Sequence, residues 1–156
     1  YKMKNIAILI VGQLRLPDLE NLYNSIKNFD IYISTYDEFY EQAKLLTNNI
    51  IITNKNDQCF NKKSIPYNNI YQWWHLNKLL YEYKETFKKY DILFKTRSDC
   101  FFIEPLSNAH FENIDSNCFY MNSDHSFYGV TKIFYHIYEN FYNDILNIYI
   151  NKGGTK

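Results

Sequence analysis

The amino-acid sequence predicts an α/β fold, a three-layer sandwich with a mostly parallel central sheet. Short apolar runs alternate with amphipathic segments along the chain, which is typical of strands alternating with helices. The first run, Ile6 to Val11, is apolar throughout, as expected of a strand covered on both faces. The 156 residues, without a repeat or linker, predict a single domain over 1–156.

The first half of the chain contains three predicted strands and two predicted helices. Gly12 closes the first strand, which we expect at the centre of the sheet. Pro17 at a helix start and acidic residues in the first turn indicate the first helix. Asp37 opens the second helix. The strands are expected at 5–12, 29–36 and 49–53, and the helices at 16–28 and 37–46.

The second half begins with a polar loop at 54–64 and continues with a helix at 68–89, for which Asn68 or Asn69 is the expected cap. A broad apolar stripe marks this helix. Three strands and a long aromatic-rich helix complete the chain. These strands are expected at 91–96, 118–121 and 126–130, and the helix at 131–150.

Composition excludes several classes of function. Seventeen cationic and seventeen acidic side chains give a net charge of zero, so we expect no nucleic-acid partner and no anionic membrane surface. No apolar run approaches twenty residues, so no transmembrane segment is predicted. No secretory signal pattern is found, which favours a cytoplasmic protein. The three cysteines match neither a disulfide framework nor a zinc pattern.

Polar residues gather where the predicted parallel strands end. The carboxyl ends of parallel strands form the ligand crevice of such folds. Gly12, Gln13 and Arg15 follow the first strand, and Thr35 and Tyr36 end the second. Gly12 lets the backbone approach a ligand, and Gln13 and Arg15 offer donors for phosphate oxygens or base edges. Neither a dinucleotide-binding fingerprint nor a Walker loop is present.

The step Thr96-Arg97-Ser98-Asp99 follows the fourth strand. Asp99 is a candidate ligand for a divalent cation bridging two phosphates, and Arg97 is a bidentate donor for the same diphosphate. Arg97 is one of only two arginines. The alternative is an intramolecular Arg97 to Asp99 ion pair that caps a loop.

A late segment, NSDHSFYG, places an acid and an imidazole between two short strands. Asp124 could act as a general base toward a hydroxyl, and His125 could bind a phosphate or a metal ion. An ordinary surface turn is an equal alternative. His75 and His136 lie among aromatic residues on helices and are predicted to be packing residues.

Five segments of the sequence, in their order and spacing, resemble glycosyltransferases of the GT-A type. The similarity is to WavE-like lipopolysaccharide- and polysaccharide-synthesis proteins and to similar proteins of giant viruses, and it covers Ile6 to about Tyr142. The segments are IAILIVGQLR, FDIYISTYD, NIYQWWHLNKLLYEY, YDILFKTRSDCFF and NSDHSFYG.

The resemblance implies a Rossmann-like GT-A fold and a nucleotide-sugar site. Phosphate and metal contacts would come from Arg97 and Asp99, with Mn²⁺ or Mg²⁺ as cofactor, and the late acidic position would be Asp124. His125 stands where relatives usually carry Gln, and Arg-Ser-Asp has one carboxylate where the usual motif has two. Relatives usually continue past Lys156, so a C-terminal portion is expected to be missing. The donor-binding residues would be Gly12, Gln13, Arg15, Thr35, Tyr36, Arg97 and His125.

The leading hypothesis is a metal-assisted glycosyltransferase of hexosyltransferase type acting in polysaccharide biosynthesis. It would move a sugar from a UDP- or GDP-sugar to a hydroxyl of a glycan, lipid-linked or protein acceptor, with Asp124 as base. A non-catalytic module that binds a nucleotide sugar is the main alternative. A hydrolase on the same scaffold would need a nucleophile or a second metal-binding carboxylate near Asp99, and the sequence offers neither.

Overall fold

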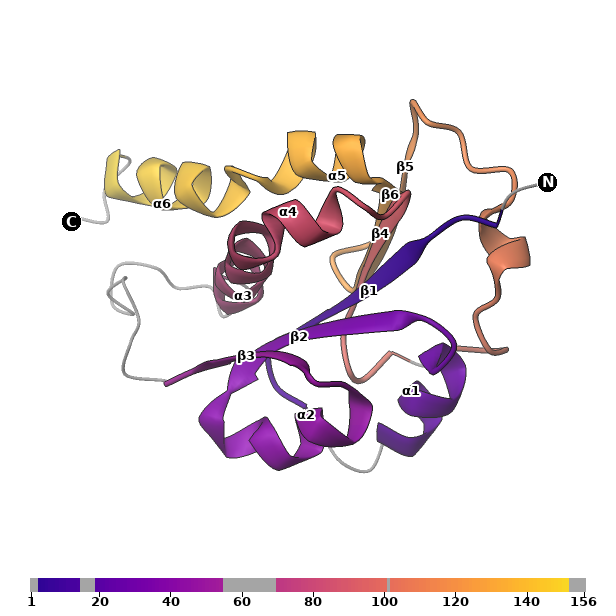
Figure 1. Cartoon of the computed structure of the whole chain (residues 1–156). Helices are drawn as coiled ribbons and strands as arrows, with labels where there is room; N and C mark the ends of the chain where they lie inside the picture. Colours follow the sequence, from indigo (N-terminus) through magenta and orange to yellow (C-terminus); the bar gives the residue numbers. More distant parts are fainter. Residues whose placement is uncertain (1–2, 15–18, 55–69, 101, 152–156) are drawn as a thin grey trace.

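The computed structural model describes residues 3–14, 19–54, 70–100 and 102–151. Its six strands form one sheet in the order β3-β2-β1-β4-β6-β5. Figure 1 shows helices α1 and α2 on one face of this sheet and helices α3 to α6 on the other. The predicted α/β class and the arrangement of helices on both faces are therefore confirmed.

The parallel part of the sheet comes from the first four strands, and β1 lies inside the sheet as predicted. β1 pairs in parallel with β2 on one side and with β4 on the other, and β3 extends the sheet beyond β2. Parallel neighbours bring their carboxyl ends to one edge of the sheet. The strands are β1 (Ile6–Val11), β2 (Asp30–Tyr36), β3 (Asn49–Thr53) and β4 (Ile92–Thr96).

The rest of the sheet is antiparallel, so the whole is mixed and the prediction of a mostly parallel sheet holds only for its first four strands. β5 (Phe119–Asn122) and β6 (Ser126–Val130) form a hairpin, and β6 pairs antiparallel with β4. Three residues separate β5 from β6, and such a short connection permits only an antiparallel pair. Ser123 in this turn has a φ of 56°.

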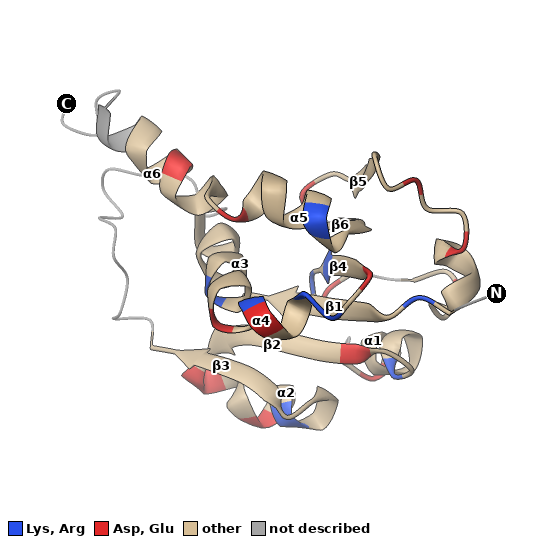
Figure 2. Cartoon of the chain, turned by 45° about the horizontal axis from the view of Figure 1, so that its top comes forward, with Lys and Arg blue, Asp and Glu red and all other residues tan. Residues whose placement is uncertain are grey.

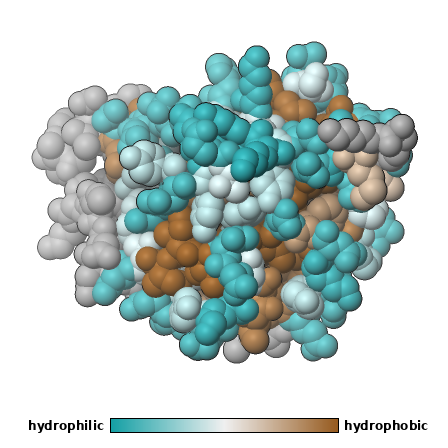
Figure 3. All heavy atoms as spheres, viewed as in Figure 1, coloured by the Kyte–Doolittle hydropathy of each residue, from teal (hydrophilic) through white to brown (hydrophobic). Residues whose placement is uncertain are grey.

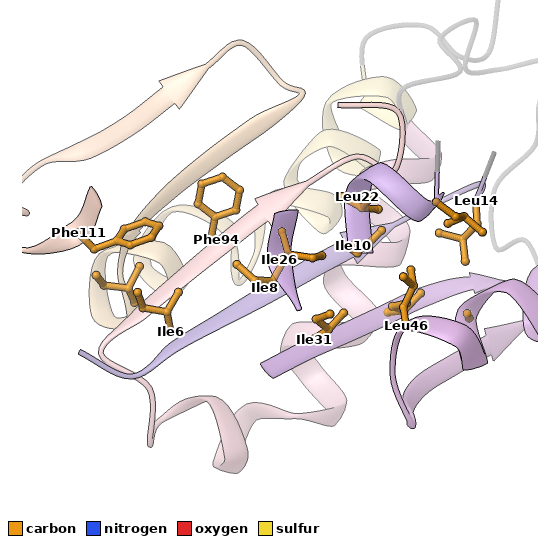
Figure 4. Packing of buried hydrophobic residues seen from close by; sticks show 14 residues of the cluster. Ile6, Ile8, Ile10, Leu14, Leu22, Ile26, Ile31, Leu46, Phe94 and Phe111 are labelled. Carbon is orange, nitrogen blue, oxygen red and sulfur yellow. The ribbon is translucent and has the colours of Figure 1, made fainter. Parts of the chain in front are cut away.

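One hydrophobic core lies between the sheet and the layer of α1 (Leu19–Ile26) and α2 (Tyr40–Leu46). Alternate residues of β1 face it, as the period of a strand requires. Figure 4 shows Ile8 near Ile26, with Phe94 and Phe111 at one end. Phe111 belongs to the 3-10 helix η3 (Asn108–Phe111) in the connection from β4 to β5. The second helix was expected to begin at Asp37, but a 3-10 helix, η1 (Asp37–Phe39), comes before α2.

The second core lies under α3 (Ile70–Glu82), α4 (Lys84–Phe87), α5 (Thr131–Tyr138) and α6 (Phe141–Asn151). Both long helices that we predicted are divided. The first breaks at Tyr83, which leaves helical geometry where its ring packs edge-on against Tyr32 at 4.9 Å. The second breaks after Tyr138, and the rings of Tyr138 and Phe141 meet across the break at 5.3 Å.

Charged side chains are rare in the strands, as Figure 2 shows. Asp30 at the start of β2 and Lys95 in β4 are the two that these six strands carry. Within the described ranges, no helix is both long and apolar enough to cross a membrane.

Candidate functional site

The candidate site lies at the edge of the sheet where β1, β2 and β4 end. Gln13 and the Arg97 to Asp99 step follow two neighbouring parallel strands. The turn from β5 to β6 reaches the same edge because β6 runs antiparallel to β4. The structure thus brings Gly12, Gln13, Arg97, Asp99, Asp124 and His125 to one edge. Arg15 lies outside the described residues.

Gly12 leaves β1 with a φ of 91°, a conformation that favours glycine. Its N–H donates to the Ser34 carbonyl at 3.0 Å, and its carbonyl accepts from Thr35 Oγ1 at 2.6 Å. A Cβ built at Gly12 would have no heavy atom within 4 Å, so the backbone here borders open space. Gln13 is exposed, and its carbonyl accepts from Ser98 Oγ at 2.8 Å. This bond ties the segment after β1 to the segment after β4.

Thr35 and Tyr36 belong to the core in this structure. Thr35 is fully buried, and only 5% of Tyr36 is exposed. The Tyr36 ring packs edge-on against the His75 ring at 4.7 Å and lies in a cluster with Trp74. Burial raises the pKa of Tyr36 to about 12. Stacking on a base would require this ring to leave the cluster.

Arg97 and Asp99 form a bidentate ion pair with each other, which is the alternative that the sequence left open beside a metal and diphosphate site. Arg97 Nε donates to Asp99 Oδ1 at 2.9 Å, and Nη2 donates to Oδ2 at 2.6 Å. These hydrogen bonds raise the pKa of Arg97 above its ordinary value. About a third of the Arg97 side chain is exposed, so its guanidinium remains accessible. Ser98 between them is buried, and its hydrogen bond to the Gln13 carbonyl anchors the turn.

A buried lysine beside this step is the main feature that our sequence reading missed. Lys95 is fully buried in β4, and its ammonium donates to Gln72 Oε1 at 2.7 Å and to the carbonyls of Asp124 and His125. It also lies 5.1 Å from the centre of the Phe127 ring, within cation–π range. Burial lowers its pKa to about 8, against the opposing effect of the Asp124 charge. A lysine within the apolar run ILFKT was the signal that could have revealed it.

Gln72 connects this lysine to Asp124. Its side-chain Nε2 donates to Asp124 Oδ2 at 2.9 Å while its Oε1 accepts from Lys95. Burial alone would raise the pKa of Asp124. The hydrogen bonds from Gln72 and from its own backbone, with the charges of His125 and Lys95, bring that pKa below its ordinary value. Asp124 is therefore a carboxylate at neutral pH, held in a fixed orientation and weak as a base.

His125 lies on the exposed side of this network. Half of its side chain is exposed, and its Nε2 lies 3.5 Å from Asp124 Oδ1. It lines a pocket of about 870 Å³ with Asp99, Ser126 and Asn122. Stacked rings of Phe94, Tyr128 and Tyr120 continue along the β4, β6 and β5 strands beside them. Asp99 and His125 thus share one pocket, whereas Asp124 points to α3.

The histidines on helices have different environments. His75 is buried as predicted, and its Nδ1 lies 2.9 Å from Ser34 Oγ. Its Nε2 has no hydrogen-bond partner among the described residues. Burial lowers the pKa of His75 to about 3, so the ring is neutral. The packing prediction for His136 is wrong, because this side chain is exposed on α5. His110 pairs with Glu104 at 2.9 Å.

The residues present do not form a fitting site for a divalent cation. Across the part of the chain that the structure describes, no three His, Cys, Asp or Glu side chains are grouped as metal ligands. Both oxygens of Asp99 accept from the Arg97 guanidinium, which would also repel a cation. The expected Mn²⁺ or Mg²⁺ site at Asp99 therefore gains no support from the geometry.

Known proteins add no family assignment to this geometry. The sequence matches no protein-family model, and no curated protein shows significant similarity to it.

Proposed function

We propose that the chain is a glycosyltransferase that uses a nucleotide-diphosphate sugar. One observation carries the proposal: the open backbone at Gly12 and the guanidinium of Arg97 lie at one sheet edge, joined by the Ser98 to Gln13 hydrogen bond. A sugar diphosphate needs close backbone approach and a planar cation at such an edge. The resemblance to GT-A glycosyltransferases supports the same function.

In this proposal Arg97 stabilises the diphosphate as it leaves the anomeric carbon. Nε and Nη2 are held by Asp99, and the guanidinium makes no other side-chain hydrogen bond within the described residues. Its remaining N–H groups are suited to two phosphate oxygens. Because Asp99 fixes the fork before the ligand arrives, little reorganisation is needed when charge develops. UDP- and GDP-sugars are the candidate donors, and a glycan, lipid-linked or protein hydroxyl is the candidate acceptor.

Asp124 has a more limited part than a strong general base. Its lowered pKa favours accepting a hydrogen bond from a sugar or acceptor hydroxyl over removing a proton. Gln72 and Lys95 hold the turn that carries it. His125 and Asp99 line the adjoining pocket, where the transferred group or acceptor would lie.

Calorimetry with UDP and GDP, each with and without Mn²⁺, tests the proposal. We expect Arg97→Lys to weaken binding about tenfold, because lysine keeps the charge but loses the planar fork. Lys44→Ala, a change at an exposed cation on α2, is the control and should bind as the wild type does. If no nucleoside diphosphate binds the wild-type protein, the proposal is wrong.

Asp99→Ala separates the two roles of Asp99. If Asp99 acts through Arg97, the variant weakens nucleotide binding by the same factor with and without Mn²⁺. A loss confined to the Mn²⁺ titration would show that Asp99 is a metal ligand and that Arg97 is secondary.

A non-catalytic nucleotide-sugar-binding module is the second candidate. The weak basicity of Asp124 and the engagement of Asp99 by Arg97 favour it. Slow hydrolysis of a UDP- or GDP-sugar without acceptor distinguishes the two, because an activated donor reacts with water whereas a passive module leaves it intact. An assay of released sugar for the wild type and Arg97→Ala decides between them.

A further inference from the structure

We propose that the chain has a second binding site, at the opposite edge of the sheet, for a single-chain anionic amphiphile such as an alkyl phosphate. A pocket of about 1090 Å³ lies there. Tyr90 and Asp91 line it just before β4 begins, and Val130 lines it where antiparallel β6 ends. The pocket is therefore separate from the edge that carries Gly12 and Arg97, and the inference does not depend on the proposed function.

The interior of this pocket suits an alkyl chain. Met3, Val130, Ile133 and Tyr135 supply apolar surface, and 62% of Met3 is exposed. The volume is slightly above the range of about 300–1,000 Å³ that is typical of small-molecule sites. Covering an apolar surface of this kind with a hydrocarbon chain is favourable, because water is released from both.

Lysines surround this apolar surface and exceed the acids that could neutralise them. Among the lining residues, Lys84 pairs with Glu139 at 2.6 Å, and Lys88 pairs with Glu85 at 2.7 Å on the same helix turn. Lys4 and Lys132 also line the pocket, and neither forms an ion pair with a described residue. Figure 2 shows a cationic and an acidic segment side by side on α4 and a cationic segment on α5. Asp91 also lines the pocket, and its Oδ2 accepts from the Asn5 N–H at 2.8 Å. Four lysines against the three acids Asp91, Glu85 and Glu139 leave a surplus of one positive charge, which favours an anion here.

The start of α5 adds backbone donors to these cations. Val130 precedes the helix and provides no side-chain cap. The Thr131 N–H donates to the Asp91 carbonyl at 3.0 Å, but the next two residues, Lys132 and Ile133, line the pocket at the first turn. First-turn N–H groups have no partner within their own helix, and together with the helix dipole they bind anions.

These features place the two parts of the ligand. A phosphate group would lie at the first turn of α5 between Lys4 and Lys132, and its alkyl chain would cover Met3, Ile133 and Tyr135. Both parts contribute to affinity, so neither inorganic phosphate nor a cationic detergent of equal chain length meets the requirements of the site.

The test uses the whole chain and dodecyl phosphate below its micelle concentration, followed by calorimetry and by amide chemical shifts in NMR. We expect saturable binding that shifts the amides of residues 131–133. Inorganic phosphate and dodecyltrimethylammonium should bind at least about tenfold more weakly. Absence of dodecyl phosphate binding would overturn the proposal, and so would equal affinity for either of the other two probes.

Lys132→Glu is the informative variant, because an acid in the first turn of a helix is favourable for folding. We expect it to weaken dodecyl phosphate binding about tenfold or more while the thermal midpoint stays the same. Lys27→Glu, an exposed charge reversal beyond the end of α1, is the control and should bind as the wild type does. Wild-type affinity in Lys132→Glu would contradict the proposed position of the phosphate.

Discussion

At the scale of single residues, Lys95 joins its own strand to two other elements. Its ammonium links β4 to α3 through the Gln72 side chain, and it links β4 to the β5–β6 turn through two backbone carbonyls. A buried ammonium is tolerated only where such acceptors replace water. Lys95 thus fixes the turn that carries Asp124 and His125, and it does so without contact with solvent.

The low pKa of Lys95 predicts a pH dependence of stability. In the folded chain this pKa is about 8, whereas the ordinary value is 10.5. Between these two pH values the unfolded chain binds a proton that the folded chain has released, so the unfolding free energy rises with pH. Below about pH 8 both states are protonated, and the contribution is constant. We expect a rise of at most about 1.4 kcal/mol per pH unit above pH 8.

Urea unfolding of the wild type and of Lys95→Met at pH 7.5 to 9.5 measures this contribution. Methionine has a similar length and cannot titrate, so the variant should lack the rise. Lys27→Met, at an exposed position, should follow the wild-type curve. Parallel curves for the wild type and Lys95→Met would show that Lys95 keeps the same protonation state in both forms.

At the scale of elements, the hairpin of β5 and β6 depends on a glycine for space. A Cβ at Gly129 would lie 2.9 Å from Phe119 Cδ2, on the paired strand. Gly12 differs, because its open surroundings leave only the cost of its positive φ. The two glycines are thus required for opposite reasons, one by packing and one by conformation.

We expect Gly129→Ala to lower the unfolding free energy by about 1–3 kcal/mol, because the Phe119 ring must move within a filled core. The double variant with Phe119→Leu should lose less than the sum of the two single changes, since leucine frees the space. A double-mutant cycle in urea measures this coupling. Strict additivity would mean that the hairpin accommodates the methyl group elsewhere.

The spacing of apolar residues in the sequence was sufficient to predict most strands and helices of this fold. β3 falls at the predicted residues, β1 is one residue shorter than predicted at each end, and β2 and β4 each begin one residue later than predicted. The helix breaks at Tyr83 and after Tyr138 were not predicted: Tyr83 packs against Tyr32, a residue far away in the sequence, and the apolar periodicity runs on through both breaks. Strand order also escaped prediction, since β6 joins β4 only through long-range pairing.

The site was predictable in part. The rule that ligands bind at strand ends placed Gly12, Gln13, Arg97 and Asp99 at one edge. It could not reveal that Tyr36 would turn into the cluster with Trp74, because the direction of a side chain at a strand end depends on the register of its neighbours. The contact between Gln72 and Lys95 joins residues 23 positions apart, so no local pattern indicates it.

At the scale of the whole molecule, two cores share one sheet. Alternate residues of β1 point into the core of α1 and α2 and into the core of α3 to α6. The loss of either core would expose one face of the same strands, so we expect both to unfold together. Figure 3 shows hydrophobic residues gathered over β2 and β3, where the sheet ends, and 39% of Ile52 is exposed there.

Tryptophan fluorescence tests this coupling, because the two tryptophans both lie on α3. Ile26→Ala removes a fully buried side chain from the opposite core. We expect it to lower the unfolding free energy detected at the tryptophans by about 2–5 kcal/mol. Leu45→Ala, at a side chain that is 73% exposed, is the control and should change it little. An unchanged tryptophan transition in Ile26→Ala would mean that the layers unfold separately.

The buried lysine also matters before the sheet exists. Without Lys95, strand β4 (Ile92–Thr96) would be an uncharged β-prone stretch of the kind that starts intermolecular aggregation. In a newly synthesised chain its ammonium is solvated and charged at neutral pH, and like charges on neighbouring chains discourage such stretches from pairing. The charge is withdrawn from solvent only when α3 and the hairpin arrive with their acceptors. Lys95 can therefore protect this strand against aggregation during folding and organise the turn beside the candidate site afterwards.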